Sequence, residues 1–573
     1  MNGFMILVLA LVYFAIGYKF YGGFIARFFK VDNNLPTPAV ENNDGVDYVP
    51  THPAVLFGHH FASIAGAGPI IGPIIACKFG WIPALIWILV GCVFVGAVHD
   101  FAALFLSVRN KGKSIGYVIE GLMSIWGRQM FLFFCWACLI LVVAVFGLLV
   151  ATTFAMSPSV ATASIIFILM APVFGFLTSR GVSLKIASCI FVPLVFATVY
   201  IAAVHPLNIA EIFNLSEEQV KNVWLIFLAV YALVASVTPV QWLLQPRDYL
   251  SSYLLYVMIA LGIVGIMVYN PEIKMTGYKG LVVTDAVGNS SYLFPELFIL
   301  IACGACSGFH SLVSSGTTSK QIRSEKDMQT VGYGAMIVEG ILGVMSLIAV
   351  IYLTDDSFAE VGKNQVMAFS KGISAFVGEL GLPQHIVEVF ISLSISAFML
   401  TSLDTATRLG RFVWQELFSP SYSYTSGTGI SVINHREYSA KTVKIIGIVR
   451  KIVANPVVAS LLVVCLAGFL VATGSANTIW PVFGASNQLL ASLTLLAITL
   501  YLMQKGCSIM VTFIPTVLMM IMSIWGLVQL VNKFIVSNMV ITVTSIFLIV
   551  MAVLMVILSF IVMYRNMKIR RFG

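Results

Sequence analysis

Charged residues are scarce in this chain. Asp, Glu, Lys and Arg make up 10% of its 573 residues, whereas 59% are hydrophobic. A soluble domain carries about 25% charged residues, so one large soluble globule is excluded. A membrane-spanning helix needs about 20 apolar residues, and about fifteen such helices would use a share of the chain close to its hydrophobic fraction. The composition is typical of an all-α polytopic membrane protein with small loops.

Several motifs of enzymes and secreted proteins are also absent. No phosphate loop, nucleophile elbow or HExxH motif occurs, so we expect no ATP hydrolysis, no catalytic residues, no cofactor and no enzyme. The nine cysteines form no secreted disulfide framework, which favours reduced, buried thiols. The CxxC pairs Cys135–Cys138 and Cys303–Cys306 lack further ligands, so no metal site is expected. The apolar start lacks a basic region and a cleavage site, which favours a first span over a signal peptide.

Apolar runs separated by polar residues, Gly or Pro predict fifteen spans. They are 4–27, 53–77, 82–108, 130–154, 160–178, 184–204, 221–246, 251–269, 293–316, 331–354, 384–405, 455–473, 481–503, 508–531 and 540–564. No polar stretch between them is long or apolar enough for a separate soluble domain, and residues 366–380 are expected to form a short amphipathic or re-entrant helix. We expect four parts, which are a first helix with a cytoplasmic loop (1–52), a core with inverted repeats (53–405), a basic cytoplasmic loop (406–454) and C-terminal helices (455–573).

Basic residues are distributed unevenly over the two sides of this topology. Of the 32 Lys and Arg residues, 25 fall on one side and 7 on the other. Cytoplasmic loops carry an excess of Lys and Arg, so the amino terminus is expected outside and the carboxyl terminus in the cytoplasm. The net charge of +8 is therefore a topology signal, and no nucleic-acid partner is expected.

Two spans contain clusters of helix-breaking residues near their centres. Span 53–77 contains Gly66-Ala67-Gly68-Pro69, and span 221–246 contains Thr238-Pro239 followed by Gln241. Two broken helices five spans apart and opposite in direction are what an inverted five-plus-five repeat of the leucine-transporter type requires. The half-helices after the breaks would point N–H groups at the membrane centre, which suits a substrate carboxylate. The alternative is a proline kink with close helix packing. The expected substrate-binding residues are Gly66, Ala67, Gly68, Pro69, Thr238, Pro239 and Gln241.

Five titratable residues share one expected depth, about 9 to 12 Å from the inner ends of four spans at about 1.5 Å per residue. They are His59, His60, Asp100, His310 and Glu339. Charged residues inside a membrane are costly, and His titrates near pH ~6.5, so the set suggests a proton relay or an inner vestibule. Separate interhelical hydrogen bonds are the alternative.

Two further sets of polar residues are candidates for a gate and an ion site. Arg247 and Asp248 are adjacent, and neighbours on a helix do not face each other, so we expect their partners to be Asp404 and Arg408. Two snorkelling interface charges are the alternative. Ser314 and Ser315 resemble the hydroxyls that bind a coupling cation in transporters of the leucine-transporter type, although serines also simply pack helices in lipid.

Seven groups of residues, in order along the chain, resemble the carbon starvation protein A family. They are Asp47–Thr51, Leu56–Phe61, Ala65–Pro69, Pro246–Ser251, Ser307–His310 with Ser314–Thr318, Asp404 with Thr407–Arg408, and Trp480–Gly484 with Asn487–Gln488. The resemblance implies a bacterial inner-membrane transporter induced on carbon starvation, with peptides or pyruvate plus protons as the proposed substrates.

These observations predict a secondary active transporter for a small carboxylate-bearing nutrient, a peptide or pyruvate. We expect uptake by alternating access, coupled to protons or, as the second choice, sodium. A membrane-embedded nutrient sensor or scaffold without net transport is the main alternative. The expected partners are the small-molecule substrate, the coupling ion and the lipid bilayer.

Overall fold

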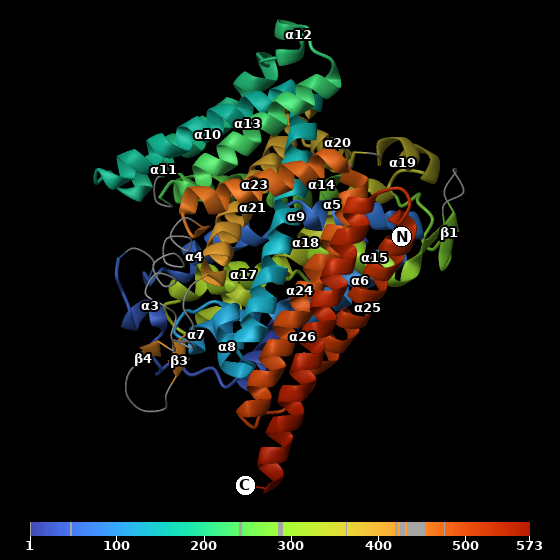
Figure 1. Ribbon diagram of the computed structural model, residues 1–573. Helices are drawn as coiled ribbons and strands as arrows, with labels where there is room; N and C mark the ends of the chain where they lie inside the picture. Colours follow the sequence, from blue (N-terminus) through green and yellow to red (C-terminus); the bar gives the residue numbers. More distant parts are fainter. Residues whose placement is uncertain are drawn as a thin grey trace.

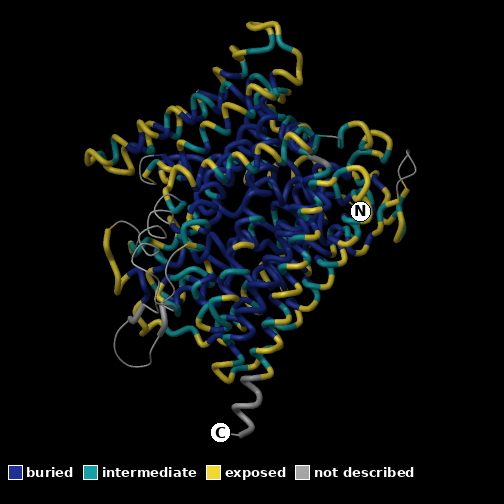
Figure 2. The backbone as a smooth tube through the Cα atoms, in the orientation of Figure 1, coloured by how far each residue is buried: buried dark blue, intermediate teal, exposed yellow. Residues whose placement is uncertain are grey.

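The chain folds into a bundle of helices of membrane-spanning length. The computed structural model describes residues 2–45, 48–239, 243–284, 290–362, 364–418, 422–424, 430–432, 453–474 and 476–572. Within them, thirteen helices are long and apolar enough to cross a membrane, and the pair α4–α5 passes the same test although it is bent by 47°. Buried residues concentrate at the centre of the bundle, and exposed residues follow the loops and outer helices (Figure 2). This confirms an all-α polytopic membrane protein.

The first half of the chain contains these elements (Figure 1): α1 (Gly3–Ile16), α2 (Gly23–Phe28), α3 (Pro38–Glu41), α4 (Pro53–Ile64), α5 (Gly68–Ala76), α6 (Trp81–Gly91), α7 (Ala97–Arg109), α8 (Ile115–Leu122), α9 (Ile125–Met156), α10 (Pro158–Ser179), α11 (Leu184–Val204), α12 (Ile209–Phe213), α13 (Glu217–Val237) and α14 (Leu244–Tyr269). The π-helical turn Gly17–Gly22 joins α1 to α2, and the turn Cys92–Gly96 joins α6 to α7.

The second half contains α15 (Leu293–Leu300), α16 (Ala302–Ala305), α17 (Phe309–Gly316), α18 (Gly334–Ile351), α19 (Asp355–Val361), α20 (Gln365–Gly378), α21 (Gln384–Leu417), α23 (Pro456–Thr473), α24 (Ala476–Gln504), α25 (Met510–Phe534) and α26 (Met539–Phe572). Two short antiparallel hairpins pair β1 (Val282–Thr284) with β2 (Ser290–Tyr292) and β3 (Tyr422–Tyr424) with β4 (Ile430–Val432). The helix expected at 366–380 is α20, whose inner face is buried.

The break predicted inside span 221–246 is wrong. Helix α13 begins at a capping box in which Ser216 and Gln219 bind each other's backbone, and it runs without a break to Val237. Its 21 residues already span a membrane. Thr238 takes an extended conformation because it precedes Pro239, so the helix ends there. The breakers therefore separate two spans, and the next span begins at Leu244 rather than near 251.

The second broken helix lies instead at 293–316. There α15, α16 and α17 follow one another, with non-helical backbone at Ile301 and Cys306. Thr51, before α4, forms a β-bridge with Ile322, after α17. At the other end Lys78 forms an ion pair with Glu296 in α15. The two broken helices therefore run in opposite directions.

The elements after the two broken helices follow the same order. A span with a π-helical turn comes first, at Cys92–Gly96 in one series and Gln329–Tyr333 in the other. A short helix follows, α8 or α20, and then a long one. Helices α9 and α21 have 32 and 34 residues and pack along each other at the centre of the bundle. The inverted arrangement is thus built on 53–156 and 293–417, with six spans between the broken helices.

Candidate functional site

The break between α4 and α5 is buried at the centre of the molecule, as predicted. Residues Gly66 to Pro69 are all buried. A Cβ atom at Gly66 would lie 2.9 Å from the Ser402 hydroxyl and 3.0 Å from the Phe146 ring, and one at Gly68 would overlap the Cys303 side chain. Only glycine therefore allows the broken helix to approach α9, α21 and α16 this closely.

Unpaired polar groups surround this break. The backbone N–H groups of Ala67 and Gly68 have no acceptor among the described residues, as expected at the start of helix α5. The Ser402 hydroxyl is fully buried and also lacks a partner in the described part of the chain. Sequence reasoning missed Ser402, because one serine in an apolar run carries no signal of its own.

The other three predicted substrate-binding residues lie elsewhere. The Thr238 hydroxyl donates to the Val234 carbonyl at 2.7 Å, and Pro239 is exposed. Both sit in the connection between α13 and α14, so they do not form a second half of the site with Gly66. Gln241 lies outside the described residues, as does Asp47 of the family motif.

At the second break the backbone N–H groups of Gly308 and Phe309 are already occupied. Asn487 of α24 accepts from the backbone N–H of Phe309 through its Oδ1 atom at 2.9 Å and from the N–H of Gly308 through its carbonyl at 3.1 Å. Its Nδ2 atom donates to the Ser307 hydroxyl at 2.9 Å. Asn487 thus caps the start of α17 and occupies two of its backbone donors, whereas no residue of the described chain occupies the N–H groups of Ala67 and Gly68 at the first break.

Three of the five predicted relay residues meet in one buried group, which we call the His310 cluster. Asp100 (α7), His310 (α17) and Glu339 (α18) are each 0% exposed. His310 Nδ1 lies 2.7 Å from Asp100 Oδ2, and its Nε2 lies 3.4 Å from Glu339 Oε2. The neighbouring His99 also contacts Asp100, at 2.8 Å. The expected common depth of these residues therefore corresponds to direct contact between three helices.

The two consecutive histidines of α4 point to different partners. His60 Nδ1 lies 2.8 Å from the Thr318 hydroxyl. His59 Nδ1 instead lies 3.9 Å from Asp248 Oδ2. Successive residues on a helix are about 100° apart, so the two rings leave α4 in different directions and meet different parts of the chain.

The predicted gate residues form a second buried group, the Arg247 network of Tyr231, Arg247, Asp248 and Asp404. Arg247 forms an ion pair with Asp404, as expected. The Tyr231 hydroxyl, which the sequence did not suggest, donates to Asp404 at 2.8 Å. The expectation that Arg247 and Asp248 do not meet is wrong. At the start of α14 the long Arg247 side chain bends back and places Nη2 3.1 Å from Asp248 Oδ1.

Arg408 does not pair with Asp248, contrary to the expectation. It donates to the carbonyls of Ala235 and Thr238, at 2.7 and 2.5 Å. Carbonyls at the end of a helix have no partner within the helix, and a cation that binds them stabilises that end. Arg408 therefore ties α21 to the end of α13.

The two serines of the predicted ion site are both buried but differ in their bonding. Ser315 Oγ donates to the Ser311 carbonyl at 2.8 Å, as serines commonly do within a helix. Ser314 Oγ has no partner in the described residues. Only Ser314 thus has a hydroxyl free for a ligand. Over the same residues, no group of three or more His, Cys, Asp or Glu is arranged to hold a metal ion.

Comparison with known proteins identifies the family. The family model described as "Carbon starvation protein CstA" matches residues 2–368 and 360–526. The chain belongs to this family. It is 33% identical to the peptide transporter CstA of Campylobacter jejuni over 91% of this chain and 80% of that protein. It is 32% identical to the pyruvate/proton symporter BtsT of Escherichia coli over 91% and 81%. The CstA-family relatives named here are therefore transporters.

Two solved structures share a low overall likeness with this CstA-family chain. A manganese transporter of Eremococcus coleocola has a TM-score of 0.44 at 10% identity, covering 91% of this chain and 99% of that one. MhsT in complex with L-phenylalanine has a TM-score of 0.41 at 11% identity, covering 88% and 99%. Likeness at this level assigns neither substrate nor mechanism.

Proposed function

We propose that this chain is a secondary active transporter that takes up a small carboxylate-bearing nutrient, a peptide or pyruvate, together with protons. The observation that carries the proposal is the His310 cluster. Two buried carboxylates face the His310 imidazole there, Asp100 also contacts the His99 imidazole, and no Lys or Arg within the described residues contacts them. Two negative charges at this depth are costly without compensation, so binding a proton would stabilise the group.

The position of the cluster supports its coupling to movement. Asp100 lies in the series 53–156, and His310 and Glu339 lie in the series 293–417. A proton that binds or leaves changes the attraction between two groups of helices. Movement of one repeat against the other is how transporters of this kind expose a central site to alternate sides.

The break at Gly66 is the proposed site for the substrate carboxylate. The N–H groups of Ala67 and Gly68 stand at the positive end of α5, and Ser402 offers a third donor. Anions bind at helix N-termini because several donors point at them and the helix dipole favours negative charge. Both a peptide and pyruvate carry the carboxylate that this arrangement would hold.

We place the protein in the bacterial inner membrane with its amino terminus outside and its carboxyl terminus in the cytoplasm. The 25-to-7 division of Lys and Arg supports this orientation. A reporter fused after Gly573 should be active only if it is of the type that works in the cytoplasm. Periplasmic activity at that position would contradict the orientation.

Uptake by purified protein in proteoliposomes tests the function. Labelled pyruvate and labelled dipeptides are offered separately, with an imposed pH or sodium gradient. We expect one of them to accumulate when the outside is acidic, and Asp100→Asn to abolish this accumulation. A sensor would bind substrate without accumulating it, and an enzyme would convert it, so either result would contradict the proposal.

A further inference from the structure

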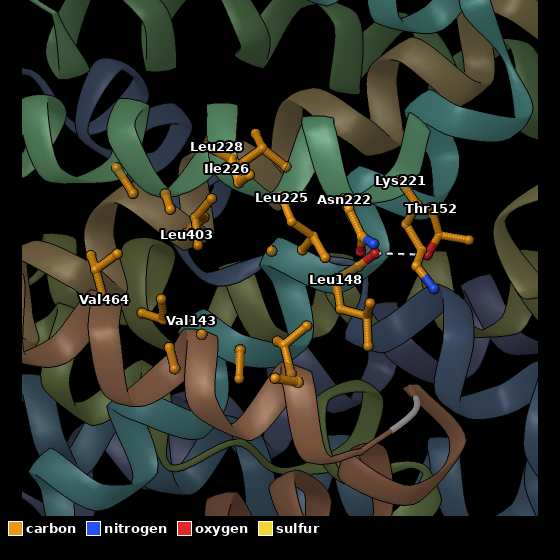
Figure 3. Close-up of a pocket in the computed structure, with 18 of the residues that line it drawn as sticks. Val143, Leu148, Thr152, Lys221, Asn222, Leu225, Ile226, Leu228, Leu403 and Val464 are labelled. Carbon is orange, nitrogen blue, oxygen red and sulfur yellow. Dashed lines mark hydrogen bonds between the residues drawn. The ribbon is translucent and has the colours of Figure 1, made fainter. Parts of the chain in front are cut away.

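A cleft of about 870 Å³ lies between α9, α13, α21 and α23, and two of its lining residues, Ala232 and Leu403, are chain neighbours of Tyr231 and Asp404 (Figure 3). Its walls are apolar and largely small, with Gly147 on α9, Ala232 on α13 and Gly468 on α23. Leu228 and Leu403 form its inner wall and are almost fully buried. The proposed transport mechanism uses none of these residues.

The cleft opens on the face of the bundle that meets lipid. Ile226 on α13 is 67% exposed although it lines the cleft, and Gly468 and Ala472 on α23 are exposed as well. All three lie within helices long and apolar enough to cross a membrane. Lipid tails are therefore the molecules that reach this opening.

The length of the cleft is close to the thickness of one leaflet. It runs from Glu218 to Ala232 along α13, which is about 21 Å at about 1.5 Å per residue and includes the polar end. Along α23 it runs from Val464 to Thr473, about 14 Å. The hydrocarbon core of a bilayer is about 30 Å thick. One acyl chain from a single leaflet therefore fits the cleft from the membrane edge to its closed end.

Polar residues gather at only one end of the cleft. Glu218, Lys221 and Asn222 line it at the start of α13, and Thr152 and Thr473 line it at the ends of α9 and α23. Figure 3 shows Lys221, Asn222 and Thr152 close together. Glu218 and Lys221 are three residues apart, so they lie on the same face of the helix. Neither forms an ion pair in the part of the chain that the structure describes. The negative Glu218 and the positive Lys221 at the membrane edge complement a zwitterionic lipid headgroup, which carries one charge of each sign.

We propose that this cleft is a binding site for one molecule of a zwitterionic phospholipid, phosphatidylethanolamine. One acyl chain fills the apolar cleft, the phosphate binds Lys221, and the ammonium group binds Glu218. The lipid belongs to the leaflet at which α13 begins. Its chain would fill the space between α13 and α23 and press on the helical turns that carry Tyr231 and Asp404.

Native mass spectrometry of the full-length protein tests this site. The protein is purified from vesicles of phosphatidylethanolamine and phosphatidylglycerol, and the lipids that remain bound are identified. Gly468→Trp fills the cleft, and no atom lies within 4 Å of a Cβ at that position, so the fold is kept. We expect the wild type to retain one phosphatidylethanolamine and Gly468→Trp to retain none.

Charge variants separate the headgroup contacts. Lys221→Gln should lower retention of both lipids by about tenfold, because both carry a phosphate. Glu218→Gln should lower retention of phosphatidylethanolamine alone. Lys533→Gln, at an exposed lysine outside the cleft, is the matched control and should retain lipid as the wild type does. Equal retention by Gly468→Trp and wild type would overturn the proposal, as would an unchanged lipid preference in Glu218→Gln.

Discussion

The two buried charge groups differ in the kind of cation at their centre. In the His310 cluster an imidazole faces two carboxylates, and each of the three groups can gain or lose a proton. In the Arg247 network a guanidinium faces Asp404 and Asp248. Arginine stays charged at every physiological pH. The first group is therefore suited to exchange protons, and the second is suited to hold helices together by a fixed ion pair.

The helices joined by each group add to this difference. The His310 cluster joins α7 to α17 and α18, which belong to the two inverted series. The Arg247 network joins α13 and α14, which lie between the series, to the long helix α21. Helix α4 packs against α14 of the Arg247 network and against α17 of the His310 cluster. A movement of α4 would therefore link protonation of the cluster to the ion pair.

Removing the fixed cation should have the largest effect. Arg247→Gln leaves Asp404 and Asp248 buried without a positive charge, which we expect to destabilise the protein by about 3–5 kcal/mol. Thermal unfolding of the purified protein measures the effect. Arg180→Gln, at an exposed arginine, should change stability by less than about 0.5 kcal/mol. Adding Asp404→Asn to Arg247→Gln should restore part of the loss, and no restoration would contradict the pairing.

Changes in the titratable cluster should impair coupling more than folding. Asn or Gln cannot change protonation, so Asp100→Asn or His310→Gln should abolish accumulation driven by a pH gradient. Exchange of labelled for unlabelled substrate should persist, because exchange need not move net protons. Asp356→Asn, at an exposed carboxylate in the first turn of α19, should behave as wild type. Asp100→Asn with full pH-driven accumulation would remove the cluster from coupling.

A smaller effect is expected from the donors at the broken helix. Ser402→Ala removes a hydroxyl that bonds nothing in the structure, so stability should hardly change. If the hydroxyl binds the substrate carboxylate, the substrate concentration that gives half-maximal uptake should rise by about tenfold. Ser396→Ala is the matched control, since Ser396 is also buried and unpartnered on α21. Equal effects of the two substitutions would argue against a contact between Ser402 and substrate.

The smallest effect is expected at the predicted ion site. If protons drive transport, the double change Ser314→Ala and Ser315→Ala should leave uptake and its pH dependence nearly unaltered. If sodium drives transport, the same change should raise the sodium concentration needed for uptake. Sodium-dependent, pH-insensitive uptake by the wild type, together with a fully active Asp100→Asn variant, is the contradicting result. It would show that Ser314, and not the His310 cluster, couples transport to the ion.

The sequence by itself determined the properties that depend on about twenty consecutive residues. All fifteen apolar runs correspond to helical segments of the structure. The breakers at Gly66 to Pro69 do interrupt a helix, because Gly and Pro weaken a helix wherever they occur in it. The same argument failed at Pro239, because a proline within a span and a proline between two spans look alike in the sequence. The capping box at Ser216 marks the start of α13 and shows that a full span ends before Pro239.

Only the tertiary structure decided which residues meet. Asp100 and His310 are 210 positions apart, so no local pattern links them, whereas opposite charge already suggested that Arg247 pairs with Asp404, 157 positions away. The shared depth of Asp100 and His310 predicted that they lie in one layer of the membrane, but it did not predict that they are in contact. Tyr231, Ser402 and Asn487 acquire their surroundings from helices distant in the chain. The physical reason is that hydropathy depends on the consecutive residues of one helix, whereas the partner of a buried polar group depends on how separate helices pack.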